Sequence, residues 1–279
     1  MGRKLLTMDV DGTAVCDDYS MGEKSKEALR AAREAGHVTA FVTGRRDVDM
    51  LSMGPDQWCV DYQILNTGGK VIRCRDRKVF CNTLIPPHAC EKLIRHCLDH
   101  HLQLQVCHGM VWQVTQLTES TRIYAQQLHK LPQIVHSARQ IYWENGLEGF
   151  MATQDMEAVA EFIDQQLPEV YYINSEPGCI DIMATGVTKW NGILWLADHL
   201  GIRHEDIITV ENYYNDIDMI QAAAVGIAVA NSLDPVKEAA DFVTENDNNH
   251  DAVAEIIENM MRGAYDLPAR KDGKEGEKS

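Results

Sequence analysis

The sequence predicts an α/β fold in which a mostly parallel sheet is interrupted by an inserted α+β module. Before residue 82 and after residue 183, short apolar runs alternate with amphipathic stretches of helical period, which is typical of parallel sheets. Between these parts, apolar and polar residues alternate with period 2, which indicates antiparallel strands with one solvated face. We therefore predict a discontinuous core of residues 1–82 and 183–267, an inserted module of residues 83–182 and a disordered tail of residues 268–279.

The chain opens with a strand, a helix and a second strand. Residues 20–35 have helical periodicity, and Gly36 is a suitable C-cap. Because a βαβ unit makes its two strands parallel neighbours, we expect Thr13 and Thr43, which follow these strands, at the same edge of the sheet. The elements predicted up to residue 82 are a strand from Leu5, the helix over 20–35, a strand over 38–42, a short helix over 47–53, a strand over 62–65 and a hairpin of 71–73 and 79–81 that leaves the sheet.

The later elements follow from the same periodicities. In the inserted module we predict a helix over 88–101, strands over 102–106, 111–114 and 149–152, a helix over 155–166 and strands near 171–174 and 179–182. The α/β pattern then resumes, and Thr188 is a suitable N-cap for a helix that ends at Leu200. The remaining predicted elements are strands over 207–210 and 225–229 and helices over 217–224, 235–240 and 251–261.

Composition excludes several classes of partner. A formal net charge of −16 argues against nucleic acid, because phosphate backbones are bound by clustered Lys and Arg. No apolar run approaches the roughly 20 residues that span a bilayer, and the first residues carry no export signal. The eight cysteines include no Cys-x-x-Cys pair and are expected to be reduced thiols. We expect a cytoplasmic protein; the sequence does not predict its oligomeric state.

Polar residues follow several predicted strands at the edge where α/β proteins bind ligands. These clusters are Asp9 with Asp11, Thr43 with Gly44, Lys189 at a helix start, and Asn215 with Asp216. Each cluster has a plain structural alternative, such as a turn or a solvated lysine. Their occurrence together at strand ends indicates a site that handles a cation or a proton.

In these clusters the chain resembles the haloacid dehalogenase superfamily, and more narrowly its Cof-type phosphatases with a C2-type α/β cap. The matching residues are Asp9-Val10-Asp11-Gly12-Thr13, Thr43-Gly44-Arg45, Lys189 and Tyr214-Asn215-Asp216-Ile217, and the resemblance covers residues 4–260. It implies a Rossmann-like core, with the inserted module as a cap. It also implies a Mg²⁺-dependent phosphatase acting on a small phosphorylated, sugar phosphate-like metabolite.

The resemblance also implies a role for each matching residue. Asp9 would be the nucleophile that forms an aspartyl-phosphate, and Asp11 the general acid and base. Lys189 would offset the charge that develops in phosphoryl transfer. The residues implied to hold phosphate are Gly12, Thr43, Gly44, Arg45, Lys189 and Asn215, and those implied to hold Mg²⁺ are Asp9, Asp11, Asn212 and Asp216.

The chain departs from the family pattern at one position. Family members usually carry Gly-Asp where this chain has Glu211-Asn212, and that aspartate binds the metal directly. An amide oxygen supplies no negative charge, so we expect weaker Mg²⁺ binding. Glu211 is not expected to substitute, because neighbouring side chains on a strand point to opposite faces. Asp216 would then hold a larger share of the metal.

Two alternatives therefore stand beside a phosphatase. One is a catalytically weakened protein that binds a phosphorylated ligand, which Asn212 motivates. The other is a phosphosugar mutase, which needs a cationic cluster to hold a bisphosphate intermediate. Arg122 and Arg139 are isolated in the sequence and do not form such a cluster.

Two groups of side chains in the module have a functional and a structural interpretation. His96 and His100 are spaced i, i+4 and could chelate Zn²⁺, but a surface position is favoured because the apolar stripe of that helix lies elsewhere. Trp112, Tyr171 and Tyr172 could line a substrate pocket, although packing on a sheet is favoured for aromatic residues on strands.

Overall fold

The computed structural model describes residues 2–54, 59–141, 144–214 and 217–267. The chain folds into two compact units, residues 1–39 with 197–279 and residues 40–196. The predicted tail of residues 268–279 and the predicted site residues Asn215 and Asp216 lie outside the described residues. The predicted boundaries of the inserted module at residues 83 and 182 stay a prediction.

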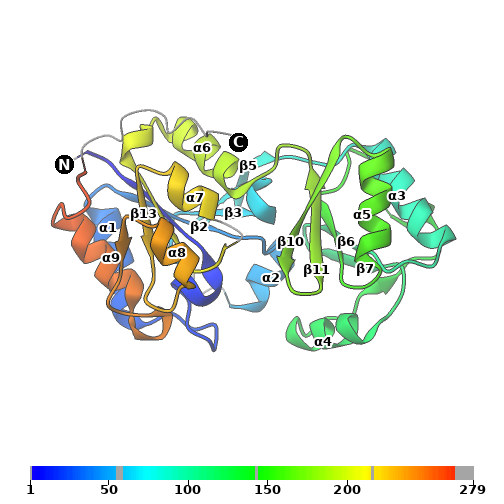
Figure 1. Ribbon diagram of the computed structural model, residues 1–279, viewed down its shortest axis with the longest axis horizontal. Coiled ribbons are helices and arrows are strands. Elements are labelled where there is room, and N and C mark those ends of the chain that lie inside the picture. Colours follow the sequence, from blue (N-terminus) through cyan, green and yellow to red (C-terminus); the bar gives the residue numbers. More distant parts are fainter. Residues whose placement is uncertain (1, 55–58, 142–143, 215–216, 268–279) are drawn as a thin grey trace. The chain divides into compact units, whose positions relative to one another are not determined.

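The first unit contains parallel strands in the order β14-β13-β12-β1. Strands β1, β12 and β13 are fully buried and rich in Leu, Ile, Val and Met, as expected for a parallel sheet. Helices α1 and α9 lie side by side (Figure 1). The elements of this unit are β1 (Leu5–Met8), α1 (Glu23–Glu34), β12 (Ile207–Glu211), α7 (Ile217–Ala222), β13 (Val225–Ala228), α8 (Asp234–Ala239), β14 (Phe242–Val243) and α9 (Ala252–Met261).

The second unit begins within β2 (Val38–Val42) and ends within α6 (Lys189–Leu200). Strand β2 pairs in parallel with β3 (Tyr62–Leu65), and α2 (Asp47–Ser52) lies between them in sequence. The hairpin of β4 (Lys70–Arg73) and β5 (Lys78–Asn82) was predicted to leave the sheet, and this prediction is wrong. Strand β4 pairs antiparallel with β3, with Leu65 opposite Lys70, because a tight turn over residues 66–69 reverses the chain directly beside it.

A second sheet, with strand order β10-β11-β9-β6-β7-β8, is contained in residues 105–184. It is antiparallel except for the pair β7–β8. The strands are β6 (Gln105–His108), β7 (Val111–Val114), β8 (Gln133–Ile134), β9 (Gly149–Ala152), β10 (Val170–Glu176) and β11 (Cys179–Ala184), and the helices are α3 (Pro87–Asp99), α4 (Glu119–Gln127) and α5 (Met156–Gln166).

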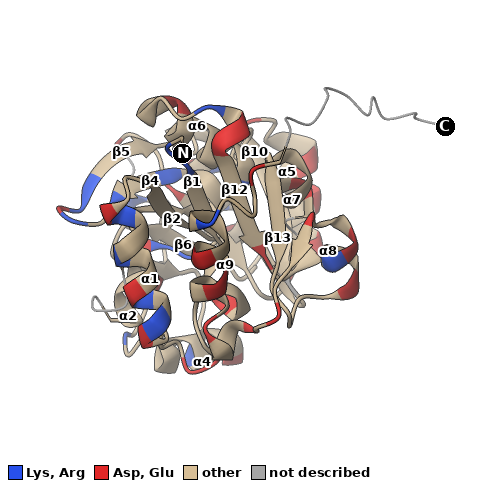
Figure 2. Cartoon of the chain, turned by 90° about the vertical axis from the view of Figure 1, so that its left-hand side faces the viewer, with Lys and Arg blue, Asp and Glu red and all other residues tan. Residues whose placement is uncertain are grey.

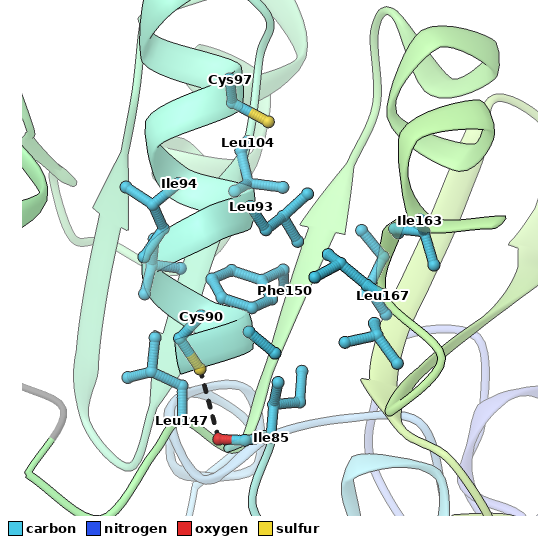
Figure 3. Packing of buried hydrophobic residues seen from close by; sticks show 14 of the residues in the cluster. Ile85, Cys90, Leu93, Ile94, Cys97, Leu104, Leu147, Phe150, Ile163 and Leu167 are labelled. Atoms are coloured by element: carbon cyan, nitrogen blue, oxygen red, sulfur yellow. Dashed lines mark hydrogen bonds between the residues drawn. The ribbon is translucent and has the colours of Figure 1, made fainter. Parts of the chain in front are cut away.

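The second sheet has its own hydrophobic core. Leu93 and Ile94 of α3 and Ile163 of α5 pack with Phe150 of β9 in one buried cluster, and the Cys90 thiol donates to the carbonyl of Ile85 at 3.3 Å (Figure 3). Burial raises the pKa of Cys90 to about 12, so this thiol is a packing group rather than a nucleophile. The module thus buries an apolar core independently of the parallel sheet.

The predicted solvated face of this sheet is covered over β6 and β7, so that prediction is wrong there. Helix α4, which the sequence analysis did not predict, packs with Trp112 and Val114. Its N-cap is Thr118, whose side chain accepts from the amide of Thr121. The polar residue Gln105 on this face is buried and accepts from the Trp112 indole at 2.8 Å. Trp112 is therefore a packing residue, in agreement with the structural interpretation.

Several predicted element bounds shift. The strand predicted over 102–106 begins only at Gln105, because Leu102 donates to Cys97 O and closes the end of α3. The helix predicted over 20–35 begins at Glu23. Gly36 follows it with φ +90°, as a C-terminal glycine should, and Thr188 Oγ1 accepts from the amide of Asn191 as the predicted N-cap of α6.

Candidate active site

The Asp9–Thr13 stretch forms an irregular turn directly after β1. Asp9 is 7% exposed, and its amide donates to the carbonyl of Val210 on β12, whereas Asp11 is exposed. Gly12 has φ +66°, which only glycine adopts readily. The two aspartates therefore differ in environment, one held at the strand end and the other open to solvent.

Two amide side chains surround this turn. Asn231 Nδ2 donates to the carbonyl of Gly12 at 2.7 Å. The Asn212 side chain lies so close to Gly12 that a Cβ there would overlap Asn212 Nδ2. Asn212 thus lies at the Asp9–Thr13 turn, and its predicted metal-binding role stays a prediction, while Asn231 is a contact that the sequence analysis missed. Nothing in the local sequence Ala230-Asn231-Ser232 marks it, because its position depends on the loop after β13.

The donor set at this turn suits a hard cation. Asp9, Asp11 and Asn212 present oxygen donors of the kind that Mg²⁺ prefers. The hydroxyl of Thr13 is buried and has no hydrogen-bond partner among the described residues. The turn therefore has one hydrogen-bonding group that none of these residues uses. Within residues 2–54, 59–141, 144–214 and 217–267, no group of three His, Cys, Asp or Glu side chains forms a metal cluster. Of the four residues predicted to hold Mg²⁺, three are described by the structure: the carboxylates Asp9 and Asp11 and the amide Asn212.

In the second unit, the Thr43-Gly44-Arg45 turn and the start of α6 both contact the loop of residues 66–69. In the 66–69 loop, the amides of Asn66 and Thr67 donate to the carbonyls of Arg45 and Thr43, both at 3.0 Å. A Cβ at Gly68 would overlap the carbonyl oxygen of Thr188, directly before Lys189. Thr43 and Lys189 are both buried. Two of the predicted phosphate-binding clusters are therefore attached to the same loop.

This loop has an unusual backbone. Asn66, Thr67 and Gly68 have φ of +52°, +55° and +103°, although a β-branched residue such as Thr67 strongly disfavours positive φ. At a non-glycine residue such as Thr67 this conformation costs about 1–3 kcal/mol, and such strained residues cluster at functional sites. The sequence analysis gave residues 66–69 no place in the site, so this loop was missed.

A pocket lies in the second unit beside Gly44. Its wall includes Arg46, Asn66, Glu148 and Asp181, together with apolar residues of β9 and β11. A Cβ at Gly44 would lie 3.4 Å from Asp181 Oδ2. The pocket therefore adjoins the predicted phosphate-binding turn and has charged groups on its wall.

The cations at this pocket are paired with carboxylates. Arg46 Nε contacts Asp49 Oδ2 at 3.0 Å, and its guanidinium also contacts Tyr124 and Cys107. Burial opposes the charge of Arg46, but Asp49 outweighs it and holds the pKa of Arg46 well above its usual value. Burial likewise raises the pKa of the Cys107 thiol to about 11.

Lys70 is held by two carboxylates. Its Nζ lies 2.6 Å from both Asp47 Oδ2 and Glu148 Oε1, and all three side chains are at least nine-tenths buried. Glu148 also accepts from Asn82 Nδ2 and the amide of Gly109. Burial would raise the pKa of Glu148, but the Lys70 charge outweighs it and lowers that pKa. Lys and Arg are otherwise conspicuous on the β4–β5 hairpin (Figure 2).

The remaining sequence candidates lie apart from this chemistry. His96 stacks on Phe162 with ring centroids 3.7 Å apart, and its neighbour His100 contacts the His96 carbonyl. Tyr171 is 43% exposed, and the hydroxyl of Tyr172 donates to Asp164 at 2.9 Å. Arg122 lies 3.8 Å from Glu119 on α4.

Comparison with known proteins decides the family. The family model of haloacid dehalogenase-like hydrolases matches residues 6–257. The chain belongs to this family. The match includes the Asp9–Thr13 turn, Thr43-Gly44-Arg45 and Lys189. The resemblance and the α/β fold inferred from the sequence are thereby confirmed.

Several curated relatives of this haloacid dehalogenase-like chain are named phosphatases. It is 24% identical over 262 residues to the 5-amino-6-(5-phospho-D-ribitylamino)uracil phosphatase YcsE of Bacillus subtilis, with 92% of this chain and 96% of the relative covered. It is 25% identical over 279 residues to the pyridoxal phosphate phosphatase YbhA of Escherichia coli, covering 92% and 98%. The prediction of a phosphatase-type hydrolase is confirmed at this level.

Solved structures share the fold. A haloacid dehalogenase-like hydrolase from Bacteroides thetaiotaomicron superposes with a TM-score of 0.81 at 21% identity, covering 93% of this chain and all of the other. A sugar phosphatase of subclass IIB superposes with a TM-score of 0.76 at 24% identity, covering 92% and 99%. No helix in the described part of the chain is long and apolar enough to cross a membrane.

Proposed function

We propose that this protein is a Mg²⁺-dependent phosphatase that hydrolyses a small phosphorylated, sugar phosphate-like metabolite through an aspartyl-phosphate. The observation that carries the proposal is the Asp9–Thr13 turn, with a buried aspartate at a strand end and an exposed one two residues later. A cytoplasmic location is part of this proposal, and the eight cysteines, none of which forms a disulfide, support it.

The two aspartates suit different roles. Asp9 is fixed by β1 and by its backbone bond to Val210, so its carboxylate is suited to attack phosphorus from a constant position. Asp11 is exposed and follows the strand, so it is suited to give a proton to the leaving oxygen and later take one from water. Thr43, Gly44, Arg45 and Lys189 are proposed to hold the phosphoryl oxygens, with Gly12 and Asn215.

Asp9, Asp11, Asn212 and Asp216 are proposed to hold Mg²⁺. When bound, the ion offsets the negative charge of the phosphate that a carboxylate must approach. The chain itself supplies the nucleophile, the proton donor and the turns that orient the ester. Because Asn212 contributes an uncharged amide, metal affinity is expected to be lower than in relatives with aspartate there.

Hydrolysis of p-nitrophenyl phosphate tests the proposal. The wild-type protein should release nitrophenol only with Mg²⁺, and Asp9→Asn should reduce kcat by at least about a thousandfold because the nucleophile is lost. Asp18→Asn, which removes an exposed carboxylate further along the same segment, is the matched control and should retain activity. Substantial turnover by Asp9→Asn would disprove the nucleophile assignment.

A second candidate is a weakened protein that binds a phosphorylated ligand without efficient turnover, and the placement of Asn212 at Gly12 favours it. Calorimetric titration with Mg²⁺ separates the two. Asn212→Asp should bind Mg²⁺ about tenfold more tightly and turn over faster, since it restores a charged ligand. If neither quantity changes, Asn212 does not contact the metal, and this candidate loses its support.

A further inference from the structure

We infer that Thr67 is a further binding residue of the candidate active site, and that its hydroxyl donates a hydrogen bond to a phosphoryl oxygen of the ester held at Gly44. This inference rests on the proposed function, because it concerns the same phosphate-binding turn. It deepens that function by one residue, since Thr67 belongs to none of the motifs that indicated the site in the sequence.

The Thr67 hydroxyl lies in the wall of the pocket beside Gly44. Thr67 is one of the residues that line this pocket, and its exposed fraction is 6%. Its Oγ1 lies 3.6 Å from the position that a Cβ on Gly44 would occupy. Among the described residues this hydroxyl has no hydrogen-bond partner. A nearly buried hydroxyl of this kind has lost most of its hydration, and a ligand in the pocket would replace the missing hydrogen bonds.

The Thr67 hydroxyl would extend the set of donors that the turn offers to an anion. The amide of Arg45 donates to Thr43 Oγ1 at 3.1 Å, so the proton of the Thr43 hydroxyl remains for a ligand. The amide of Thr67 donates to the Thr43 carbonyl at 3.0 Å, which fixes the two threonines relative to each other. A phosphoryl oxygen accepts several hydrogen bonds, and those to an ionised acceptor are the strongest.

A carboxylate near the same point makes a neutral donor useful. Asp181 Oδ2 lies 3.4 Å from the Cβ position at Gly44. Its negative charge is among those that raise the pKa of Arg46, so this acid acts on a cation of the pocket wall. A phosphoryl group beside Asp181 would still be repelled by it. The Thr67 hydroxyl would offset part of that repulsion with a hydrogen bond and adds no charge to the wall.

The backbone of Thr67 adopts a conformation that its side chain disfavours. Its φ and ψ are +55° and +29°, in the left-handed region that β-branched residues rarely enter. The loop is held from outside, because a Cβ at Gly68 would overlap the Thr188 carbonyl and a Cβ at Gly192 would overlap Gly68. Strained residues persist where their surroundings fix them, and they cluster at functional sites. Glycine would form this turn without the strain, so the threonine is best explained by its side chain.

Three substitutions at Thr67 separate the hydroxyl from the strain. Thr67→Val removes the hydroxyl and keeps the branched shape, Thr67→Ser keeps the hydroxyl, and Thr67→Gly removes both the hydroxyl and the strain. The dissociation constant of inorganic phosphate, titrated calorimetrically with Mg²⁺ present, should rise at least about tenfold for Thr67→Val and Thr67→Gly, because a hydrogen bond to a charged group is lost. For Thr67→Ser it should stay within about threefold of the wild-type value.

Urea unfolding distinguishes this role from a purely structural one. Thr67→Gly should raise the unfolding midpoint, since glycine adopts positive φ readily, while it weakens phosphate binding. A structural role predicts the opposite, namely that the more stable variant binds phosphate at least as well. His101→Gly is the matched control: His101 is exposed at φ +57° after α3, and this substitution should leave phosphate binding unchanged.

The outcomes separate this inference from the proposed function. Phosphate binding by Thr67→Val or Thr67→Gly that equals that of the wild type overturns the inference, as does a tenfold loss in Thr67→Ser or a wild-type protein that does not bind phosphate. If p-nitrophenyl phosphate is not hydrolysed but phosphate binding follows the expected pattern, the phosphatase function fails and the role of Thr67 stands. Hydrolysis together with unchanged phosphate binding in Thr67→Val gives the reverse result.

Discussion

Replacing Lys70 by Met should destabilise the protein strongly, because Lys70 neutralises two buried carboxylates. Its ammonium lies 2.6 Å from Asp47 and from Glu148, and none of the three side chains is more than 10% exposed. Removing one partner of a buried ion pair typically costs about 3–5 kcal/mol, since the other charge is left in a poor solvent.

The surrounding contacts place the cost near the lower end of that range. After the substitution, Asp47 keeps its contact with Arg77 at 3.0 Å, and Glu148 keeps the Gly109 amide and the Asn82 side chain. These partners compensate part of the lost charge, so we expect the free energy of unfolding to fall by about 3 kcal/mol.

Urea unfolding followed by circular dichroism measures this loss. Lys70→Met with Glu148→Gln should lose less than the sum of the two single variants by at least about 1 kcal/mol, because the double variant removes the uncompensated charge at 148. Arg73→Met, which removes an exposed ion pair with Asp76 on the same hairpin, should leave the midpoint nearly unchanged. A loss below about 1 kcal/mol for Lys70→Met would refute the assignment of a buried, mutually dependent triad.

Two further predictions concern the same unit. Gly68→Ala should destabilise the protein by more than about 2 kcal/mol and lower kcat, because the new Cβ would overlap Thr188 O at the start of α6; Gly186→Ala, at φ +87° with open space around it, should show only the smaller cost of positive φ in urea unfolding. The stabilisation that Glu148 contributes should depend on pH. Its pKa is lower in the folded than in the unfolded state, so the stabilisation is present above about pH 4 and is lost as pH falls through the folded value. The difference in unfolding free energy between wild type and Glu148→Gln should shrink from pH 7 to pH 3, and a constant difference would contradict this.

The parallel part of the fold was predictable because its signals are local. Buried strands such as Leu5–Met8 and Ile207–Glu211 are short apolar runs bounded by polar turns, and the helix N-cap at Thr188 has its hydroxyl where the rule requires it. Helix α4 was missed because its apolar face is short. Its position depends on packing with Trp112 and Val114 and with Val48 of α2, which is far from α4 in the sequence.

The site was predictable only where its residues belong to short contiguous motifs. Asp9, Asp11, Thr43 and Gly44 belong to short motifs, so their types and spacing suffice. Asn231, Asn66, Glu148 and Asp181 carry no motif, and each reaches its place through a contact between elements far apart in the chain. The pairing of Lys70 with its two carboxylates likewise depends on the fold, because Lys70 and Glu148 are 78 residues apart in the sequence.

At position 212, the fold requires a side chain of a certain shape, whereas the chemistry depends on its charge. The backbone carbonyl of Asn212 accepts from the amide of Leu233, and its side chain fills the space above Gly12; an aspartate has the same shape and would do both. The family fold is therefore compatible with either residue, which explains why a chain with Asn212 retains the whole α/β topology. What differs is one negative charge beside Asp9 and Asp11. With asparagine, the two carboxylates are spared a third like charge, and under the proposed function a bound cation would meet one negative charge less. The departure in sequence would then act on metal binding, whereas the architecture is intact.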